Sequence, residues 1–159
     1  MHRKRALRHI ALLLMVSLGG ATSPAWGDHH PASSISETDV IQPAQLVARL
    51  KDGTQPAPLV LQVGSHVLYA QAHIEGSYYV GSASTDEGLK ALRARVAALP
   101  KNAPIVLYCG CCPWSRCPNI APAYEELHRL GYSNTKALYI VNDFGTNWVD
   151  AGYPVAKGE

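Results

Sequence analysis

From residue 42 onward, short apolar runs alternate with longer segments in which apolar residues recur every three or four positions. A compact apolar run bounded by Pro or Gly predicts a strand buried on both faces, and the longer recurrence predicts an amphipathic helix. The predicted strands are residues 59–63, 77–80, 104–108 and 136–141. Strands alternating with helices favour an α/β fold with a small, mainly parallel sheet flanked by helices on both faces.

Local signals mark the ends of three helices. Pro43 suits a first helical turn, and Ser84 and Glu87 have the spacing of a capping box. Asn119 is a typical N-cap, and Gly131 is a typical helix stop. The predicted helices therefore run from Pro43 to about Lys51, from Ser84 to about Leu99 and from about Asn119 to Leu130.

The first 27 residues show the three-part pattern of a secretory signal peptide. Basic residues precede the apolar run Ile10–Leu18, and small residues lead to Ala25-Trp26-Gly27. The run is shorter than the roughly 20 residues that span a bilayer, so we expect cleavage, not an anchor. The expected location is the periplasm or the outside of the cell, with no membrane span after cleavage.

Removal of residues 1–27 changes the charge of the chain. The full sequence has 14 Lys and Arg against 12 Asp and Glu, a formal charge of +2. The first 27 residues hold four of the basic residues and no acidic ones, so the rest has 14 − 4 = 10 basic against 12 acidic residues, a charge of −2. With no basic stripe left to neutralise phosphates, nucleic acid is not an expected partner.

The segment that follows the predicted cleavage point is polar. Residues 28–41 show no sustained hydrophobic period, which predicts a flexible N-terminal segment. The remaining residues 42–156 are long enough for one domain and short for two.

All four cysteines lie in the nine-residue sequence Cys-Gly-Cys-Cys-Pro-Trp-Ser-Arg-Cys at 109–117. This loop follows the predicted strand that ends at Tyr108, and ligand sites of parallel sheets lie beyond such carboxyl ends. Exposed N–H groups, a helix N-terminus and Arg116 would stabilise an anion or a thiolate there. A disulfide within the loop would close only a tiny ring, so stability is a weak reason for these cysteines.

Several segments in order resemble a single-domain rhodanese over most of residues 42–156. They are residues 59–63, Tyr69, His-Ile-Glu-Gly-Ser at 73–77, Ile105–Cys109, residues 127–132, Trp148 and Gly152-Tyr153-Pro154. The resemblance implies a sulfurtransferase, in which a cysteine takes up sulfane sulfur as a persulfide and passes it on. The implied partners are a small sulfur-containing anion and a protein thiol or persulfide, and no cofactor is implied.

The resemblance also implies roles within the cysteine loop. Cys109 ends the central strand and is therefore the expected nucleophile. Cys111 is the alternative, because counting from it restores the Cys-x4-Arg spacing of the family up to Arg116. The expected substrate-binding residues are Gly110, Trp114 and Arg116, and the thiols expected to resolve or protect the persulfide are Cys111, Cys112 and Cys117.

The sequence departs from the rhodanese pattern at several points. Gln62-Val63-Gly64 stands where the family has Asp-x-Arg, so the corresponding ion pair is missing. The cysteine loop is longer than usual and contains Pro113, which has no N–H to donate. Asn142-Asp143-Phe144-Gly145 replaces a Gly-Gly before the late tryptophan.

Two other functions remain open on the same fold. One is a thiol–disulfide relay, in which Cys109 pairs with Cys112 or Cys117. The other is a metal-binding module without turnover, in which the closely spaced thiolates hold Cu(I) or zinc. The metal ligands would then be Cys109, Cys111, Cys112 and Cys117.

Overall fold

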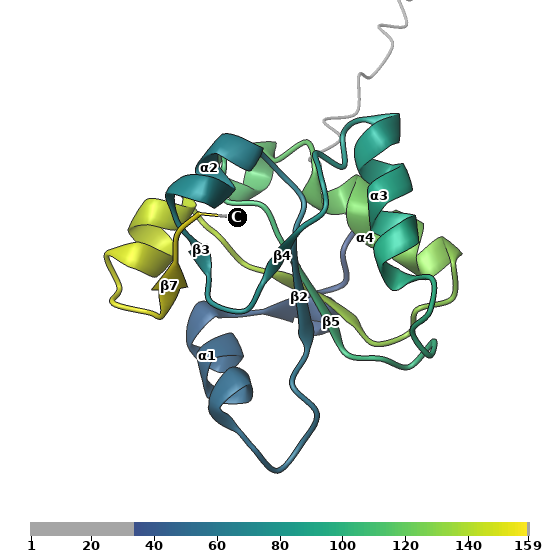
Figure 1. Ribbon diagram of the computed structural model, residues 1–159, viewed down its shortest axis with the longest axis horizontal. Coiled ribbons are helices and arrows are strands. Elements are labelled where there is room, and N and C mark those ends of the chain that lie inside the picture. The colour runs from purple at the N-terminus through teal and green to yellow at the C-terminus, as the bar shows by residue number, and fades with distance from the viewer. Residues whose placement is uncertain (1–33, 159) are drawn as a thin grey trace, which may run out of the picture.

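The computed structural model describes residues 34–158, which contain a sheet of five parallel strands in the order β1-β6-β5-β2-β4 (Figure 1). Its strands are β1 (Val40–Ile41), β2 (Leu59–Gln62), β4 (Tyr78–Tyr79), β5 (Ile105–Tyr108) and β6 (Thr135–Leu138). Strands β3 (His73–Ile74) and β7 (Val155–Ala156) form a separate antiparallel pair. The predicted α/β fold with a mainly parallel sheet is confirmed. The predicted signal peptide, residues 1–27, lies outside the described residues.

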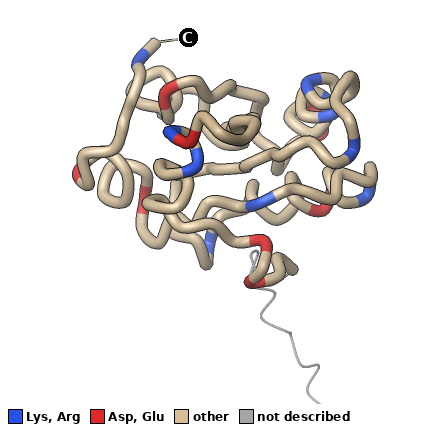
Figure 2. The backbone as a smooth tube through the Cα atoms, turned by 90° about the horizontal axis from the view of Figure 1, so that it is seen from below, with Lys and Arg blue, Asp and Glu red and all other residues tan. Residues whose placement is uncertain are grey.

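Helices cover both faces of the sheet. They are α1 (Pro43–Lys51), α2 (His66–Gln71), α3 (Asp86–Val96) and α4 (Ile120–Arg129), with short helical turns η1 (Glu37–Asp39), η2 (Trp114–Arg116) and η3 (Gly145–Val149). Helices α3 and α4 pack on one face, and α1 and η3 pack on the other (Figure 1). Basic and acidic residues are interspersed along the described chain (Figure 2). Within residues 34–158, no helix is long and apolar enough to cross a membrane.

Strand β5 shows why both faces need a cover. Ile105 and Leu107 belong to the core under α3 and α4, whereas Val106 and Tyr108 belong to the core under α1. Successive side chains of a strand point to opposite faces, so the next residue, Cys109, turns toward α4. It is accordingly part of the α3/α4 core. The alternation along β5 therefore decides on which side of the sheet the cysteine loop begins.

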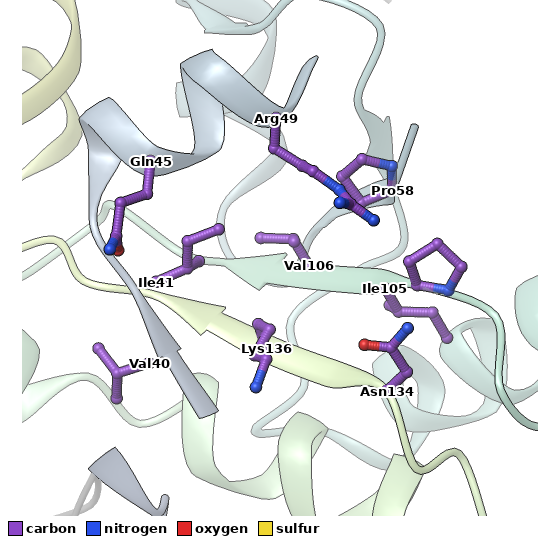
Figure 3. A pocket seen from close by; sticks show the side chains of 10 residues that line it. Val40, Ile41, Gln45, Arg49, Pro58, Ile105, Val106, Asn134 and Lys136 are labelled. Atoms are coloured by element: carbon purple, nitrogen blue, oxygen red, sulfur yellow. The ribbon is translucent and has the colours of Figure 1, made fainter. Parts of the chain in front are cut away.

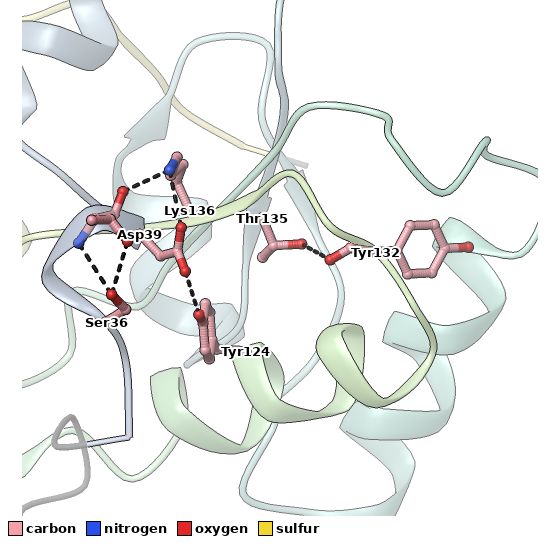
Figure 4. A network of polar contacts seen from close by, with 7 residues as sticks. Ser36, Asp39, Tyr124, Tyr132, Thr135 and Lys136 are labelled. Atoms are coloured by element: carbon pink, nitrogen blue, oxygen red, sulfur yellow. Dashed lines mark hydrogen bonds and ion pairs between the residues drawn. The ribbon is translucent and has the colours of Figure 1, made fainter.

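The N-terminal boundary of the domain lies earlier than the sequence indicates. Val40–Ile41 falls in the segment predicted to be flexible, yet it pairs with β6 as the edge strand β1. A polar network fixes it (Figure 4): Tyr124 of α4 donates to Asp39 at 2.7 Å, and Lys136 of β6 forms a 3.0 Å ion pair with the same carboxylate. These contacts come from residues about 90 positions away, so a local polar pattern does not reveal them.

Two further elements differ from the predictions. β6 ends at Leu138, not at residue 141, because the backbone then leaves the sheet and the Val141 carbonyl accepts a hydrogen bond from Trp114 N. Helix α2 is absent from the sequence prediction, since only Tyr69 of its residues is buried. That one residue anchors the helix: its hydroxyl donates to the Ser77 carbonyl at 2.6 Å, and its ring stacks on His73.

Helix α1 begins at Pro43 as predicted, whereas the predicted caps of α3 and α4 differ from the observed ones. The N-cap of α3 is Thr85, whose hydroxyl accepts from Gly88 N at 3.1 Å, so Glu87 is not at the position that a capping box requires. Asn119 stands at the N-cap of α4, but its side chain makes no cap bond. That side chain is directed to the cysteine loop.

Candidate functional site

The cysteine loop leaves the sheet at the carboxyl end of β5 and is held at two points. Gly110 has a φ of +93°, a conformation that favours glycine, and its carbonyl accepts from Phe144 N at 3.1 Å. A Cβ at Gly110 would lie 2.6 Å from Phe144 Cβ, too close for a larger residue without a shift. Trp114 N donates to the Val141 carbonyl at 3.2 Å. The loop is thus tied to the segment that follows β6.

This loop gathers all four cysteine sulfurs into what we call the thiol cluster, within 4.8 Å of one another. Cys111 makes the closest contacts: its Sγ lies 3.1 Å from Cys109 Sγ and 3.2 Å from Cys112 Sγ. Cys109 and Cys117 are buried, and Cys111 and Cys112 are half-buried. All four are free thiols. The structure thus brings together the four cysteines that the sequence predicts to share one site.

The thiol cluster ionises most readily at Cys111. Hydrogen bonds from Cys109 and then Cys117 hold the pKa of Cys111 well below its usual value, because a thiolate accepts their S–H groups. The pKa of Cys109 is raised, first by its hydrogen bond to Cys111, and the pKa of Cys112 is raised, first by burial. A thiolate on one sulfur opposes ionisation of the next, so the cluster carries its first negative charge on Cys111.

Asn119 is a residue of the site that the sequence interpretation misses. Its side-chain amide donates to Cys109 Sγ at 3.4 Å and to Cys111 Sγ at 3.9 Å. Its amide oxygen accepts from Ser82 Oγ at 2.7 Å and from Ser84 N at 2.9 Å, which fixes the orientation of the amide. The partners lie 35 and 37 residues away. The available signal is the position itself: a polar residue two places after Cys117, at the start of a helix.

A small cavity adjoins the thiol cluster. Its volume is about 10 Å³, close to the space that one water molecule occupies. It is lined by sulfur and apolar side chains and by one glycine: Cys109, Gly110, Cys112, Trp114, Cys117, Ile120, Leu138 and Ile140. Such a cavity has room for a single atom such as sulfur, but not for a phosphate or a sulfonate group.

The structure separates the three residues predicted to bind substrate. Gly110 and Trp114 line the cavity, and the Trp114 ring packs edge-on against Tyr139 at 5.2 Å. Arg116 is exposed and does not line the cavity. Arg116 therefore lies outside the cavity that Gly110 and Trp114 line.

The turn after β2 shows how the missing ion pair of the rhodanese pattern is replaced. Gln62 is buried, and its side-chain oxygen accepts from Gly64 N at 3.0 Å. Gly64 also faces the site, since a Cβ there would lie 2.8 Å from Cys109 Sγ. A neutral hydrogen bond thus closes this turn, and the absence of a side chain at Gly64 leaves room for the Cys109 sulfur.

The thiol cluster also suits a thiophilic metal ion. A zinc–sulfur bond of about 2.3 Å places the sulfurs of a tetrahedral site about 3.8 Å apart. The observed sulfur separations begin at 3.1 Å and stay within 4.8 Å, so they span that value. Cys109, Cys111, Cys112 and Cys117 are the residues that would hold such an ion.

The chain matches one known protein family. The Rhodanese-like domain family matches residues 42–151, most of the described region, and the chain belongs to this family. Among curated proteins, none matches the sequence.

Solved structures agree on the fold. The Alr3790 protein from Anabaena sp. is 19% identical with a TM-score of 0.57, and the alignment covers 74% of this chain and 92% of that one. The BH2092 protein from Bacillus halodurans is 20% identical with a TM-score of 0.56, covering 74% and 75%. RPA3614 from Rhodopseudomonas palustris, described as a possible tyrosine phosphatase, is 18% identical with a TM-score of 0.54, covering 79% and 88%. At these identities, the likeness establishes the rhodanese-like fold alone.

Proposed function

We propose that this protein is a sulfurtransferase that carries sulfane sulfur as a persulfide on Cys111. The observation that carries the proposal is the position of the Cys111 sulfur: it is half-exposed and in contact with the thiols of Cys109 and Cys112. A nucleophile of this kind needs access to its donor and neighbours that stabilise the thiolate. Membership of the rhodanese-like family supports the reaction class.

The choice of Cys111 over Cys109 follows from access. Cys109 is only 4% exposed and contacts Cys111 and Asn119, whereas Cys111 is half-buried, so an external donor reaches Cys111 more readily. The lowered pKa of Cys111 and the raised pKa of Cys109 favour the same choice. The spacing to Arg116 fits as well, since Arg116 stands five positions after Cys111.

The proposed reaction is one displacement at sulfur. The Cys111 thiolate attacks the outer sulfur of a donor such as thiosulfate and forms a new S–S bond. The S–S bond of thiosulfate breaks, and sulfite leaves with the bonding electron pair. Arg116, which is exposed beside the loop, attracts the anionic donor. The cavity next to the cluster is too small for the oxyanion, which stays outside.

The size and lining of the cavity beside the thiol cluster argue against a phosphatase. A phosphate needs several N–H or cationic donors around its oxygens. The cavity beside the thiol cluster is lined by thiols and apolar side chains and measures about 10 Å³. It offers neither the donors nor the space, so the phosphatase description of a structural neighbour is not carried over to this chain.

We propose further that the protein acts after export, in the periplasm or outside the cell. The support is the signal-peptide pattern of residues 1–27. Expression of the full chain with fractionation of the cells tests this proposal. The expected result is a periplasmic or secreted protein whose mass lacks about the first 27 residues. Recovery of the uncleaved chain in the cytoplasm would overturn it.

The test of the proposed reaction is release of sulfite from thiosulfate by the reduced, metal-free protein. Wild type, Cys111→Ser and Cys109→Ser are compared, each checked for folding by circular dichroism. We expect wild type and Cys109→Ser to release sulfite and Cys111→Ser to release none. The tryptic peptide that contains Cys111 in Cys109→Ser should gain the mass of one sulfur atom.

Each other pattern of results has a definite meaning. Sulfite release by Cys111→Ser but not by Cys109→Ser would assign the nucleophile to Cys109. The sulfurtransferase proposal would be overturned if no folded form released sulfite from thiosulfate and none gained the mass of one sulfur atom from inorganic polysulfide. Oxidation to a disulfide between Cys109 and Cys112 or Cys117, without sulfur uptake, would favour the thiol–disulfide relay.

A second candidate function is binding of Cu(I) or zinc. It is favoured by the convergence of all four sulfurs within 4.8 Å. Competition against a coloured Cu(I) chelator, or against a zinc indicator, measures it directly. One ion bound per chain, lost when Cys109 and Cys111 are both replaced by Ser, would support this candidate. No competition with either indicator would exclude it.

A further inference from the structure

We propose that Cys109 resolves the persulfide on Cys111, releasing hydrosulfide and leaving a disulfide between the two residues. The inference rests on the proposed function, since it begins from the Cys111 persulfide. It adds a second activity, the reduction of sulfane sulfur to sulfide by the protein's own thiols. It is carried by geometry: Cys109 Sγ is the sulfur nearest to Cys111 Sγ, at 3.1 Å.

The proposed step balances in atoms and electrons. Cys109 sulfur attacks the inner sulfur of the persulfide, the one that belongs to Cys111. A Cys109–Cys111 bond forms, and the bond to the outer sulfur breaks. The outer sulfur leaves with the electron pair and takes the thiol proton of Cys109 as hydrosulfide. Two thiols are oxidised to a disulfide, and one sulfane sulfur is reduced by two electrons.

Chain geometry favours Cys109 over Cys112 as the resolving residue. Cys112 Sγ is almost as close to Cys111 Sγ, at 3.2 Å, but the two residues are adjacent. Adjacent Cα atoms across a trans peptide are about 3.8 Å apart, below the roughly 4.4 Å that ordinary disulfides need. No cis peptide occurs in the described chain. Cys109 is separated from Cys111 by Gly110, which relaxes this restriction.

Burial makes Cys109 an internal reactant. Only 4% of Cys109 is exposed, so thiols in solution do not reach its sulfur. Within the cluster, however, this sulfur lies 3.1 Å from that of Cys111 and can react with it. Gly64 leaves the space that the Cys109 sulfur occupies, because a Cβ there would come within 2.8 Å of it. The fold therefore keeps beside the half-buried nucleophile a second thiol that is buried and protected from external reaction.

Asn119 supports the attacking sulfur. Its amide hydrogen bond to Cys109 Sγ, at 3.4 Å, is shorter than the one to Cys111 Sγ, at 3.9 Å. An N–H donor stabilises negative charge on the sulfur it contacts, and Cys109 must lose its proton to attack. Because Ser82 and Ser84 hold the amide oxygen, the donor stays directed at the sulfurs.

The resolved protein needs an external dithiol before it can act again. A dithiol is the class of reductant that exchanges efficiently with a disulfide, since its second thiol completes the exchange. In the proposed reaction sequence, a sulfane-sulfur donor loads the protein with sulfur. The protein then releases hydrosulfide, and a dithiol reduces the disulfide that remains.

The test follows three products in a single turnover with thiosulfate, under anaerobic conditions, with no added reductant. They are sulfite, hydrosulfide and the disulfide located by peptide mass spectrometry. For the wild type we expect one hydrosulfide for each sulfite and a Cys109–Cys111 disulfide. For Cys109→Ser we expect sulfite without hydrosulfide, and one sulfur atom retained on Cys111. In Cys112→Ser, whatever the rate, each sulfite should still be matched by one hydrosulfide and a Cys109–Cys111 disulfide, since the resolving sulfur is present.

The outcomes separate this inference from the proposed function. If wild type releases sulfite but keeps the sulfur atom on Cys111, the inference is wrong and the sulfurtransferase proposal stands. If thiosulfate yields no sulfite and inorganic polysulfide adds no sulfur atom to Cys111, both are wrong. Hydrosulfide from wild type with the disulfide at another pair, such as Cys111 and Cys117, would also overturn the role of Cys109. The disulfide map of wild type decides the matter even if Cys109→Ser does not fold.

Discussion

The two ends of the central sheet differ in space and in chemistry. Near the amino ends of the strands, between α1 and the sheet, lies a cavity of about 430 Å³ (Figure 3). It is lined by Val40, Ile41, Gln45, Arg49, Pro58, Pro104, Ile105, Val106, Asn134 and Lys136, none of which is a nucleophile or an acid. At the carboxyl ends, four thiols lie together, and three of them line a cavity of about 10 Å³. Volume is therefore a poor guide to reactivity in this molecule.

The difference has a cause in the strands themselves. In a parallel sheet, all strands end at the same edge, where loops lead to helix N-termini and backbone N–H groups are exposed. The large cavity lies at the opposite edge and offers charged groups without reactive ones. Under the proposed function, the transferred group is a single sulfur atom, which needs far less space than the large cavity provides.

The largest expected effect comes from Gly110→Ala in the cysteine loop. The new Cβ would meet Phe144 Cβ at 2.6 Å, at a φ of +93°. We expect a loss of about 2 to 4 kcal/mol in the free energy of unfolding, measured in urea. Gly131→Ala is the matched control, since its φ is +86° but nothing lies within 4 Å of the new Cβ. Equal losses in the two variants would show that the contact with Phe144 is unimportant.

Asn119→Asp should change the reactivity of Cys111 with less effect on stability. Aspartate still accepts hydrogen bonds from Ser82 and Ser84, but it no longer donates to sulfur and adds a negative charge beside it. We expect the pKa of Cys111 to rise by about one unit or more. The rate of alkylation by iodoacetamide as a function of pH measures this change. Because Ser82→Ala keeps the donor, an equally large shift in that control would contradict the direct role of the amide.

Arg116→Ala compares the charges at the two ends of the sheet. If Arg116 attracts the anionic donor, its loss should raise the KM for thiosulfate about two- to fivefold and leave kcat nearly unchanged, as expected for an exposed charge. Arg49→Ala removes a charge from the large cavity at the other end. The same rise in KM for Arg49→Ala would mean that net charge, not position, attracts the donor.

The smallest effect is expected at Asp39, beside the large cavity. Burial acts to raise its pKa, but hydrogen bonds from Tyr124 and Lys136 outweigh burial and hold the pKa below the usual 3.8. A carboxyl with a lowered pKa adds stability above its unfolded-state pKa, and this stability is lost as the pH falls through the folded-state value. We expect Asp39→Asn to cost about 1 kcal/mol or less at pH 7, with the difference from wild type shrinking as the pH falls below 3.8. Urea unfolding over this pH range checks this, and a constant difference would refute it.

The sequence predicts the doubly covered strands well and the short elements poorly. Residues 59–63 and 104–108 are recognisable because both faces are buried, so nearly every position is apolar. Val40–Ile41 and helix α2 escape prediction because two or six residues carry no period, and distant partners such as Lys136 stabilise them. Tertiary contacts, not local propensity, decide such elements.

The residues of the candidate site also differ in how well the sequence predicts their roles. The cysteine spacing alone indicates a shared site, because nine residues between a strand and a helix cannot separate four side chains widely. From the sequence, the strand-end position favours Cys109 as nucleophile over Cys111, but exposure and the contacts between the sulfurs, on which the choice of Cys111 rests, are visible only in the structure. Asn119 escapes prediction because its role depends on Ser82 and Ser84, which a helix-capping interpretation does not include.

The attachment of the cysteine loop has a consequence for how the site comes into being. The loop is tied through Trp114 and Gly110 to the Val141 carbonyl and Phe144 N, about 30 residues further along the chain. A ribosome therefore synthesises all the cysteines before the segment that arranges them. Until that segment is in place, four unprotected thiols are open to any oxidant in their surroundings. The four thiols are therefore arranged correctly only after the whole chain has folded. The yield of active protein should depend on keeping the cysteines reduced until then.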